Sequence, residues 1–269
     1  MRFALIDNKQ TEAKTGLRGI CPGCLQPVVA KCGERKIHHW AHKSNKMCDS
    51  WWEPETEWHR SWKDNFPRDW QEVFLPDEQT GEKHIADIQT SNGFVIEFQH
   101  SPIHPQERQA RERFYKNMVW VVDGTRLKRD CPRFLKGRKD FCTIRKGLFR
   151  VDMVNEYFPP DWTGSSVAII FDFKGLETIP DATDPRNTLY CLFPERLGRY
   201  GILAEVSRAT FIKTVISGEW MVREHRFREY TRQFEKEINE RAILERRIQT
   251  NMAFQRFMGI ARHPRRRRL

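Results

Sequence analysis

The 269-residue sequence lacks any apolar run long enough to form a membrane-spanning helix. Its opening residues, MRFALIDNKQTEAK, also lack the apolar stretch of a secretory signal peptide. These two absences argue against an integral membrane protein. They predict a cytoplasmic protein that has no membrane partner.

Acidic residues are fewer than basic ones, and cysteines are scarce. The chain has 36 Asp and Glu against 47 Lys and Arg, so its formal net charge of +11 favours a polyanionic partner, nucleic acid first. Seven cysteines are an odd number, and in a reducing compartment they are more typical of thiols or metal ligands than of disulfides. With 39% hydrophobic and 31% charged residues, the composition indicates a globular protein rather than a disordered chain.

Most of the excess positive charge lies in the last part of the sequence. Residues 223–269 hold 14 Lys or Arg against 6 Asp or Glu, a net of +8. Residues 223–257 contain no Pro or Gly and carry apolar residues at steps of three or four, which predicts a long amphipathic helix. A basic tail follows it, formed by Arg265, Arg266, Arg267 and Arg268. Two interpretations stay open, namely direct contact of this segment with nucleic acid, or a packing helix with a solvated tail.

The middle of the sequence alternates between helical and strand patterns. Helices are expected at residues 53–65 and 105–117, and strands at 71–75, 84–90, 93–100 and 118–122. A meander of three strands followed by a helical crossover predicts an α/β fold, with a mixed sheet that carries helices on its faces. Downstream, the pattern predicts loops at 124–163, strands at 167–173 and 190–193, and a strand and a helix within 199–219.

The N-terminal segment has the spacing of a structural metal site. Cys21 and Cys24 form a CxxC turn, and His39, His42 and Cys48 follow within reach. Zinc prefers four thiolate or imidazole ligands in a tetrahedron, so we expect Cys21, Cys24, His42 and Cys48 to bind Zn²⁺, with His39 as a substitute. A redox CxxC pair or a chance pattern is the alternative. A site with four protein ligands has no open position and performs no chemistry.

Two acidic residues stand on neighbouring predicted strands. Side chains alternate along a strand, so Glu97, Gln99 and Ser101 share one face. If the strands pair across the turn at 91–93, Asp87 lies beside Glu97. Two converging carboxylates suit a hard cation such as Mg²⁺, which supports phosphodiester hydrolysis. The alternative is a hairpin that exposes both acids on its solvent face.

A further polar stripe precedes these strands. Glu55, His59 and Lys63 are four residues apart, which puts them on one face of the expected helix. Such stripes are common on exposed helices, so the stripe alone is weak support for a site.

Taken together, these motifs resemble the CoiA-like competence nuclease family, a branch of the PD-(D/E)XK nuclease superfamily. The resemblance covers about residues 15–125 and depends on the order and spacing of the motifs rather than on any one of them. The similar segments are Cys21–Cys24 with His39–His42 and Cys48, Glu55–Lys63, Ala86–Ile88, Glu97–Ser101, Arg111–Tyr115 and Val119–Asp123.

The resemblance implies a restriction-endonuclease-like core of order αβββαβ and DNA cleavage that depends on Mg²⁺ or Mn²⁺. The core would span 51–163, between a zinc-ribbon-like module at 1–50 and a mixed or helical region at 164–269. Asp87 and Glu97 would bind the catalytic ion, and Glu55 would support it, with Glu57 as a substitute.

One position departs from the superfamily pattern. Gln99 stands where most members have a lysine, whose charge would stabilise the attacking hydroxide. Lys63 or Arg111 would then supply the positive charge, and the stripe that contains His59 would be catalytic.

Three functions follow from these observations. The first is a metal-dependent DNA nuclease that acts in DNA uptake, recombination or defence against foreign DNA. The second is a nuclease fold without activity that binds DNA. The third is an interaction protein that forms a homodimer or docks a partner through its C-terminal helix.

Overall fold

The computed structural model describes residues 1–43, 49–51, 53–78 and 81–260. It consists of two compact units, Met1–Met221 and Val222–Leu269. Among the helices in these described ranges, none is both long enough and apolar enough to cross a membrane.

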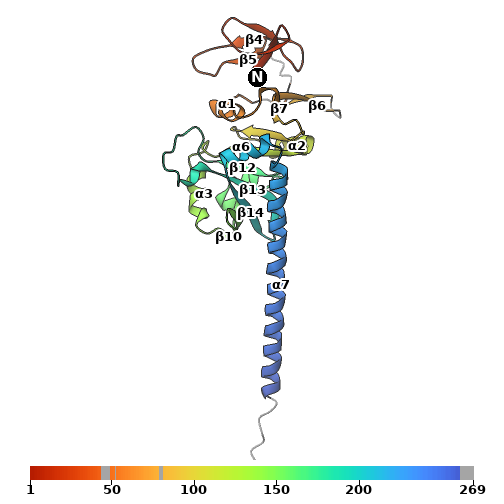
Figure 1. Ribbon diagram of the computed structural model, residues 1–269, viewed down its shortest axis with the longest axis vertical. Helices are drawn as coiled ribbons and strands as arrows, with labels where there is room; N and C mark the ends of the chain where they lie inside the picture. The colour runs from red at the N-terminus through yellow and green to blue at the C-terminus, as the bar shows by residue number, and fades with distance from the viewer. Residues whose placement is uncertain (44–48, 52, 79–80, 261–269) are drawn as a thin grey trace, which may run out of the picture. The chain divides into compact units, whose positions relative to one another are not determined.

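The first 42 residues form a small antiparallel sheet, drawn in red in Figure 1. Its strands are β1 (Phe3–Ile6), β2 (Lys9–Glu12), β3 (Arg18–Ile20), β4 (Pro27–Lys31) and β5 (His39–His42), in the order β2-β1-β3-β4-β5. A small core of Ala4, Val28 and Trp40 holds the strands together. The buried indole of Trp40 also donates a hydrogen bond to the Thr11 carbonyl, at 2.8 Å.

A larger, nine-stranded mixed sheet follows, in the order β10-β11-β14-β13-β12-β9-β8-β7-β6. Strand β9 runs parallel to both β8 and β12, and the other neighbours are antiparallel. The sheet thus has an all-parallel centre between two antiparallel wings. The predicted α/β class with a mixed sheet is confirmed.

The elements expected in the middle of the chain are present in the expected order. They are α1 (Glu57–Lys63), β6 (Gln71–Pro76), β7 (Lys83–Gln89), β8 (Val95–Gln99), α2 (Pro105–Tyr115) and β9 (Met118–Asp123), with a 3-10 turn, η1 (Arg68–Trp70), before β6. Helix α1 is shorter than predicted because Thr56 caps it: the Thr56 side chain accepts from the backbone of His59, and the His59 side chain accepts from the backbone of Thr56.

The prediction of loops at residues 124–163 is wrong. This stretch holds α3 (Asp130–Arg138), β10 (Cys142–Arg145), β11 (Leu148–Val151), α4 (Val154–Tyr157) and α5 (Pro160–Thr163). These elements are too short to show a clear period, so their local pattern resembles that of a loop. They form because they pack: fully buried Phe134 of α3 contacts the rings of Phe173 and Tyr190.

Strands from beyond residue 163 belong to the same large sheet. They are β12 (Ile169–Asp172), β13 (Thr188–Leu197) and β14 (Tyr200–Ser207). The 3-10 turn η2 (Pro185–Asn187) directly precedes β13, and helix α6 (Arg208–Ile216) follows β14. Because β12 pairs directly with β9, the sheet crosses the boundary expected at residue 163. The division into regions 1–50, 51–163 and 164–269 stays a prediction about folding units.

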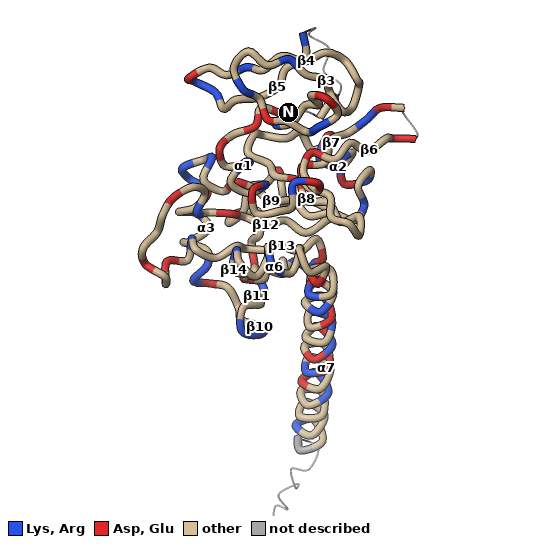
Figure 2. The backbone as a smooth tube through the Cα atoms, turned by 45° about the horizontal axis from the view of Figure 1, so that its top comes forward, with Lys and Arg blue, Asp and Glu red and all other residues tan. Residues whose placement is uncertain are grey.

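The predicted C-terminal helix is present as α7 (Trp220–Ile260), of 41 residues. Figure 2 shows acidic and basic positions mixed along it. Pairs such as Glu224 with Arg228 and Lys236 with Glu240 stabilise successive turns. The expected basic tail, Arg265–Arg268, lies outside the described residues.

Candidate functional site

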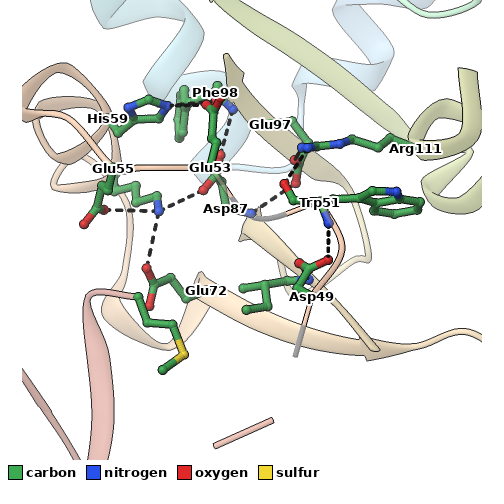
Figure 3. Close-up of a pocket in the computed structure, with 13 residues that line it drawn as sticks. Asp49, Trp51, Glu53, Glu55, His59, Glu72, Asp87, Glu97, Phe98 and Arg111 are labelled. Carbon is green, nitrogen blue, oxygen red and sulfur yellow. Dashed lines mark hydrogen bonds and ion pairs between the residues drawn. The ribbon is translucent and has the colours of Figure 1, made fainter. Parts of the chain in front are cut away.

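A polar pocket of about 60 Å³ gathers residues from α1, α2, β6, β7 and β8 and from the segment before α1 (Figure 3). Lys63 comes from α1, Asp87 from β7, Glu97 from β8 and Arg111 from α2. The sequence-predicted residues Glu55 and His59 line the same pocket. One small cavity therefore brings together six of the residues that the sequence singled out.

Asp87 and Glu97 lie opposite each other where the β7–β8 ladder opens. The strands pair at Ile88 with Ile96 and at Gln89 with Val95, so the next opposed positions are Asp87 and Glu97. The Asp87 N–H donates to Glu97 Oε1 at 3.2 Å, and the Phe98 N–H donates to Asp87 Oδ2 at 2.9 Å. Each carboxylate accepts from the other strand's backbone, which holds both at the opening.

The alternative of a solvent-facing hairpin is wrong. Glu97 is only 2% exposed, because Arg111 of α2 covers its face of β8. The opposite face is covered by α1, whose Trp62 ring stacks on Phe98 at 5.6 Å. Strand β8 is therefore buried on both faces, and its polar side chains need partners inside the protein.

Lys63 places a buried positive charge among three carboxylates. Its Nζ lies 2.8 Å from Asp87 Oδ1, 3.2 Å from Glu55 Oε1 and 3.6 Å from Glu72 Oε1. Burial lowers the pKa of this ammonium, but the opposing charges outweigh burial and hold the pKa well above its usual value. Lys63 therefore remains a cation throughout the physiological range.

Glu55 is an ionised partner of this cation at neutral pH. Burial would raise the pKa of Glu55, but the charges of Lys63 and Arg60 outweigh it and lower that pKa to about 2. Glu55 precedes α1 rather than lying on it, so the predicted helical stripe holds only for His59 and Lys63. Glu57, the proposed substitute for Glu55, is exposed and is not among the pocket residues.

Glu97 has the opposite electrostatic environment. Burial, with repulsion from Asp87, raises the pKa of Glu97 to about 8, although Arg111 opposes the shift. Arg111 Nη1 lies 3.1 Å from Glu97 Oε2, and its other nitrogen binds Glu107 and the Trp51 carbonyl. The pKa values of Glu55 and Glu97 are thus shifted in opposite directions within the same pocket.

Gln99 and His59 both contact the carboxylate of Glu53, a residue that the sequence pattern did not identify. The Gln99 amide donates to Glu53 Oε2 at 2.9 Å. The Thr56 N–H donates to His59 Nδ1, so the ring proton lies on Nε2, which is 2.9 Å from Glu53 Oε1. Gln99 does not line the pocket itself. It fixes Glu53, which does, whereas the buried cation of the pocket is Lys63.

Asp49 and Glu72 were also missed. Buried Asp49 accepts from the Ile85 N–H at 2.9 Å, and Glu72 accepts from the Arg2 N–H with both oxygens at 2.8 Å. Asp49 belongs to an irregular segment, and Glu72 has a left-handed backbone with φ of 51°. Neither position carries a periodic signal, so pattern analysis could not find it.

The N-terminal module brings three of the predicted zinc ligands together. Ligand atoms of Cys21, Cys24 and His42 all lie within 4.8 Å of one another, and Cys24 Sγ is 3.1 Å from His42 Nε2. In the part of the chain that the structure describes, this is the one group of three or more such atoms. His39 lies elsewhere, with Nδ1 at 2.9 Å from the Ile37 carbonyl, and Cys48 falls outside the described residues.

Comparison with known proteins confirms the resemblance to CoiA-like proteins. Residues 6–50 match the family model described as "Competence protein CoiA, N-terminal domain". Competence protein CoiA of Bacillus subtilis (strain 168) is 27% identical over 148 residues, a match that covers 49% of this chain and 38% of that relative. The similarity therefore extends over well under half of the relative's length. No solved structure matches the chain.

Proposed function

We propose that this CoiA-like protein is a divalent-metal-dependent DNA nuclease of the PD-(D/E)XK superfamily, which hydrolyses phosphodiester bonds. The observation that carries the proposal is the opposition of Asp87 and Glu97 at the open end of the β7–β8 ladder, beside the cation of Lys63. Similarity to a competence protein supports a role in competence, and DNA uptake or recombination, or defence against foreign DNA, is the setting we propose.

The donor set fits a hard cation. Asp87 and Glu97 offer carboxylate oxygens, which Mg²⁺ and Mn²⁺ prefer, and both would hold the ion. When bound, the ion would polarise the phosphate and lower the pKa of a water molecule. Lys63 and Arg111 balance the negative charge of these carboxylates within a buried pocket.

Lys63 has a distinct task in this proposal. Because its pKa is raised, it does not accept a proton at neutral pH and is no general base. Its fixed charge would instead stabilise negative charge that develops on the phosphate. Glu55 and Glu72 hold the ammonium in place from the side away from Asp87, and His59 and Gln99 hold Glu53.

The cysteine–histidine cluster has a separate, structural role. Thiolates and an imidazole are the donors that Zn²⁺ prefers, so we assign Cys21, Cys24 and His42 to a structural zinc, with Cys48 as the proposed fourth ligand. The metal would tie the CxxC turn to β5.

A cleavage assay tests the proposal. Linear and plasmid DNA are incubated with Mg²⁺ or Mn²⁺ and with wild type, Asp87→Ala or Asp69→Ala, the last an exposed acid outside the pocket. We expect Asp87→Ala to lose at least the roughly 100-fold in activity that mutation of a residue supporting a metal ligand can cost, and Asp69→Ala to retain activity. Equal cleavage by wild type and Asp87→Ala would refute the nuclease, and DNA binding without cleavage under either ion would favour the inactive module.

A further inference from the structure

A second cavity, also of about 60 Å³, lies where the parallel strands β8 and β9 end. Gln99 and His100 border it from the end of β8, and Asp123 and Arg126 from the end of β9. It shares no residue with the carboxylate pocket, although the adjacent residues Phe98 and Gln99 belong one to each. Ligands of α/β sheets commonly bind outside the carboxyl ends of parallel strands.

An unsatisfied buried acceptor borders this cavity. Gln99 is 3% exposed, and its Oε1 has no hydrogen-bond partner within the described ranges. Its amide nitrogen already donates to Glu53 and to the Ser101 carbonyl, which fixes the orientation of the amide. Buried polar atoms are normally hydrogen-bonded, so we expect Gln99 Oε1 to accept a hydrogen bond from a bound water or ligand.

A fixed histidine lies next to it. His100 Nδ1 is 2.8 Å from Asp123 Oδ2, and Asp123 Oδ1 accepts from the backbone and hydroxyl of Thr125, at 2.9 and 2.6 Å. Both carboxylate oxygens of the buried Asp123 are thus hydrogen-bonded to neighbouring residues of the protein. His100 keeps 34% of its side chain exposed, and Nε2 has no hydrogen bond to any residue that the structure describes.

Positive charge borders the same cavity. Arg126, Arg129 and Arg133 all line it, together with the acids Asp123, Asp130 and Asp161. Arg133 is paired with Asp130 at 3.1 Å, whereas no carboxylate of the described chain lies within ion-pair distance of Arg126 or Arg129. The guanidinium forks of these two arginines match the geometry of phosphate oxygens.

From these observations we propose that the cavity is a subsite for a phosphate group of a nucleic-acid strand whose neighbouring phosphodiester enters the carboxylate pocket. Arg126 and Arg129 bind the phosphate, and Gln99 Oε1 accepts from a water molecule that accompanies it. The inference rests on the proposed function, because it names how that same site would hold its substrate. The phosphate is either internal to the strand or at its end.

Salt-dependent binding tests the subsite without requiring cleavage. Fluorescence anisotropy with a labelled DNA duplex, in Ca²⁺ instead of Mg²⁺, gives the affinity of wild type and of the double variant Arg126→Ala/Arg129→Ala. Neither arginine side chain caps α3 or forms an ion pair in the described structure, so the fold should persist. The matched control is Lys136→Ala/Lys139→Ala, which removes the same charge from exposed positions outside the cavity.

We expect the slope of log affinity against log salt to fall by about 2 for the arginine variant, about 1 for each lost phosphate contact, and by less for the lysine control. Equal slopes for the two double variants, or no DNA binding by wild type, would overturn the subsite. A preference of wild type for a phosphorylated end, lost in the arginine variant, assigns a terminal phosphate; loss of slope without such a preference assigns an internal one.

The two proposals fail separately. If Asp87→Ala cleaves like wild type while the arginine variant still loses slope, the nuclease proposal falls and the phosphate subsite stands. If cleavage depends on Asp87 but the two double variants bind DNA alike, the subsite falls and the nuclease stands.

Discussion

Lys63 Nζ lies 2.8 Å from Asp87 Oδ1, so the α1 helix places a cation directly on the β7 carboxylate. Gln99 of β8 instead binds Glu53, so its side chain and the Lys63 ammonium have different partners.

The first prediction concerns Lys63→Met. It leaves Asp87, Glu55 and Glu72 without their shared buried cation, and breaking a buried ion pair in this way costs about 3 kcal/mol. Urea denaturation should show this fall in the free energy of unfolding. The exposed Lys9→Met is the control, and similar unfolding midpoints for the two variants would contradict the account.

The second prediction concerns pH and Glu97. Its folded pKa of about 8 lies above the unfolded value near 4.5, so the folded state holds the extra proton between these values. Its contribution to stability is therefore full below pH 4.5 and is lost as pH rises to about 8. The free energy of unfolding of wild type, relative to Glu97→Gln, should fall across this window by at most about 1.4 kcal/mol per pH unit.

Chemical denaturation at several pH values measures this difference. Glu55→Gln is the informative counterpart, because the Glu55 pKa is lowered to about 2 and its contribution is lost only as pH falls from about 4.5 toward 2. A difference between wild type and Glu97→Gln that does not change from pH 4.5 to 8 would show that Glu97 is not buried beside Asp87.

The third prediction concerns the N-terminal metal site. Purified protein should contain about one zinc per chain by elemental analysis, the number that a single tetrahedral site holds. Cys24→Ser should lose most of the metal and lower the melting temperature, because zinc that binds only the folded state stabilises it. The exposed Cys142→Ser is the control. Wild-type protein that contains no zinc, or Cys24→Ser that keeps its full zinc content, would contradict the proposed zinc site.

The fourth prediction concerns helix α7. Leu244, Ile248 and Met252 are spaced four apart on one side of α7, and all three are exposed, so they form an apolar stripe that a second copy of the helix can cover. We expect the full chain to have twice its monomer mass by light scattering, and residues 1–221 alone to be monomeric. Leu244→Glu/Ile248→Glu should also be monomeric. If the full chain is a monomer, α7 does not dimerise the protein, and a different partner must be sought.

Local patterns were sufficient for several parts of the molecule. Alternation of apolar residues located β7 and β8, and the absence of Pro and Gly located α7. The CxxC spacing led to Cys21, Cys24 and His42, which do cluster. These signals are readable because each depends on residues that are close in the sequence.

Other parts depend on contacts between distant segments. Asp172, which is completely buried in β12, accepts hydrogen bonds from the indoles of Trp58 and Trp62, both at 3.0 Å. These bonds attach α1 to a strand more than 100 residues later in the chain. No local pattern marks Asp172 as the anchor of that helix.

The sequence by itself determined the order of helices and strands around the carboxylates, the pairing of β7 with β8 and the cysteine–histidine cluster, because hydrophobic period and short-range spacing encode them. Only the tertiary structure decided that Lys63 pairs with Asp87 and that the Gln99 amide donates to Glu53. It also decided that Asp49 and Glu72 line the same pocket. The physical reason is that a buried charge takes its partners from whichever segments the packed sheet brings near it, regardless of their separation along the chain.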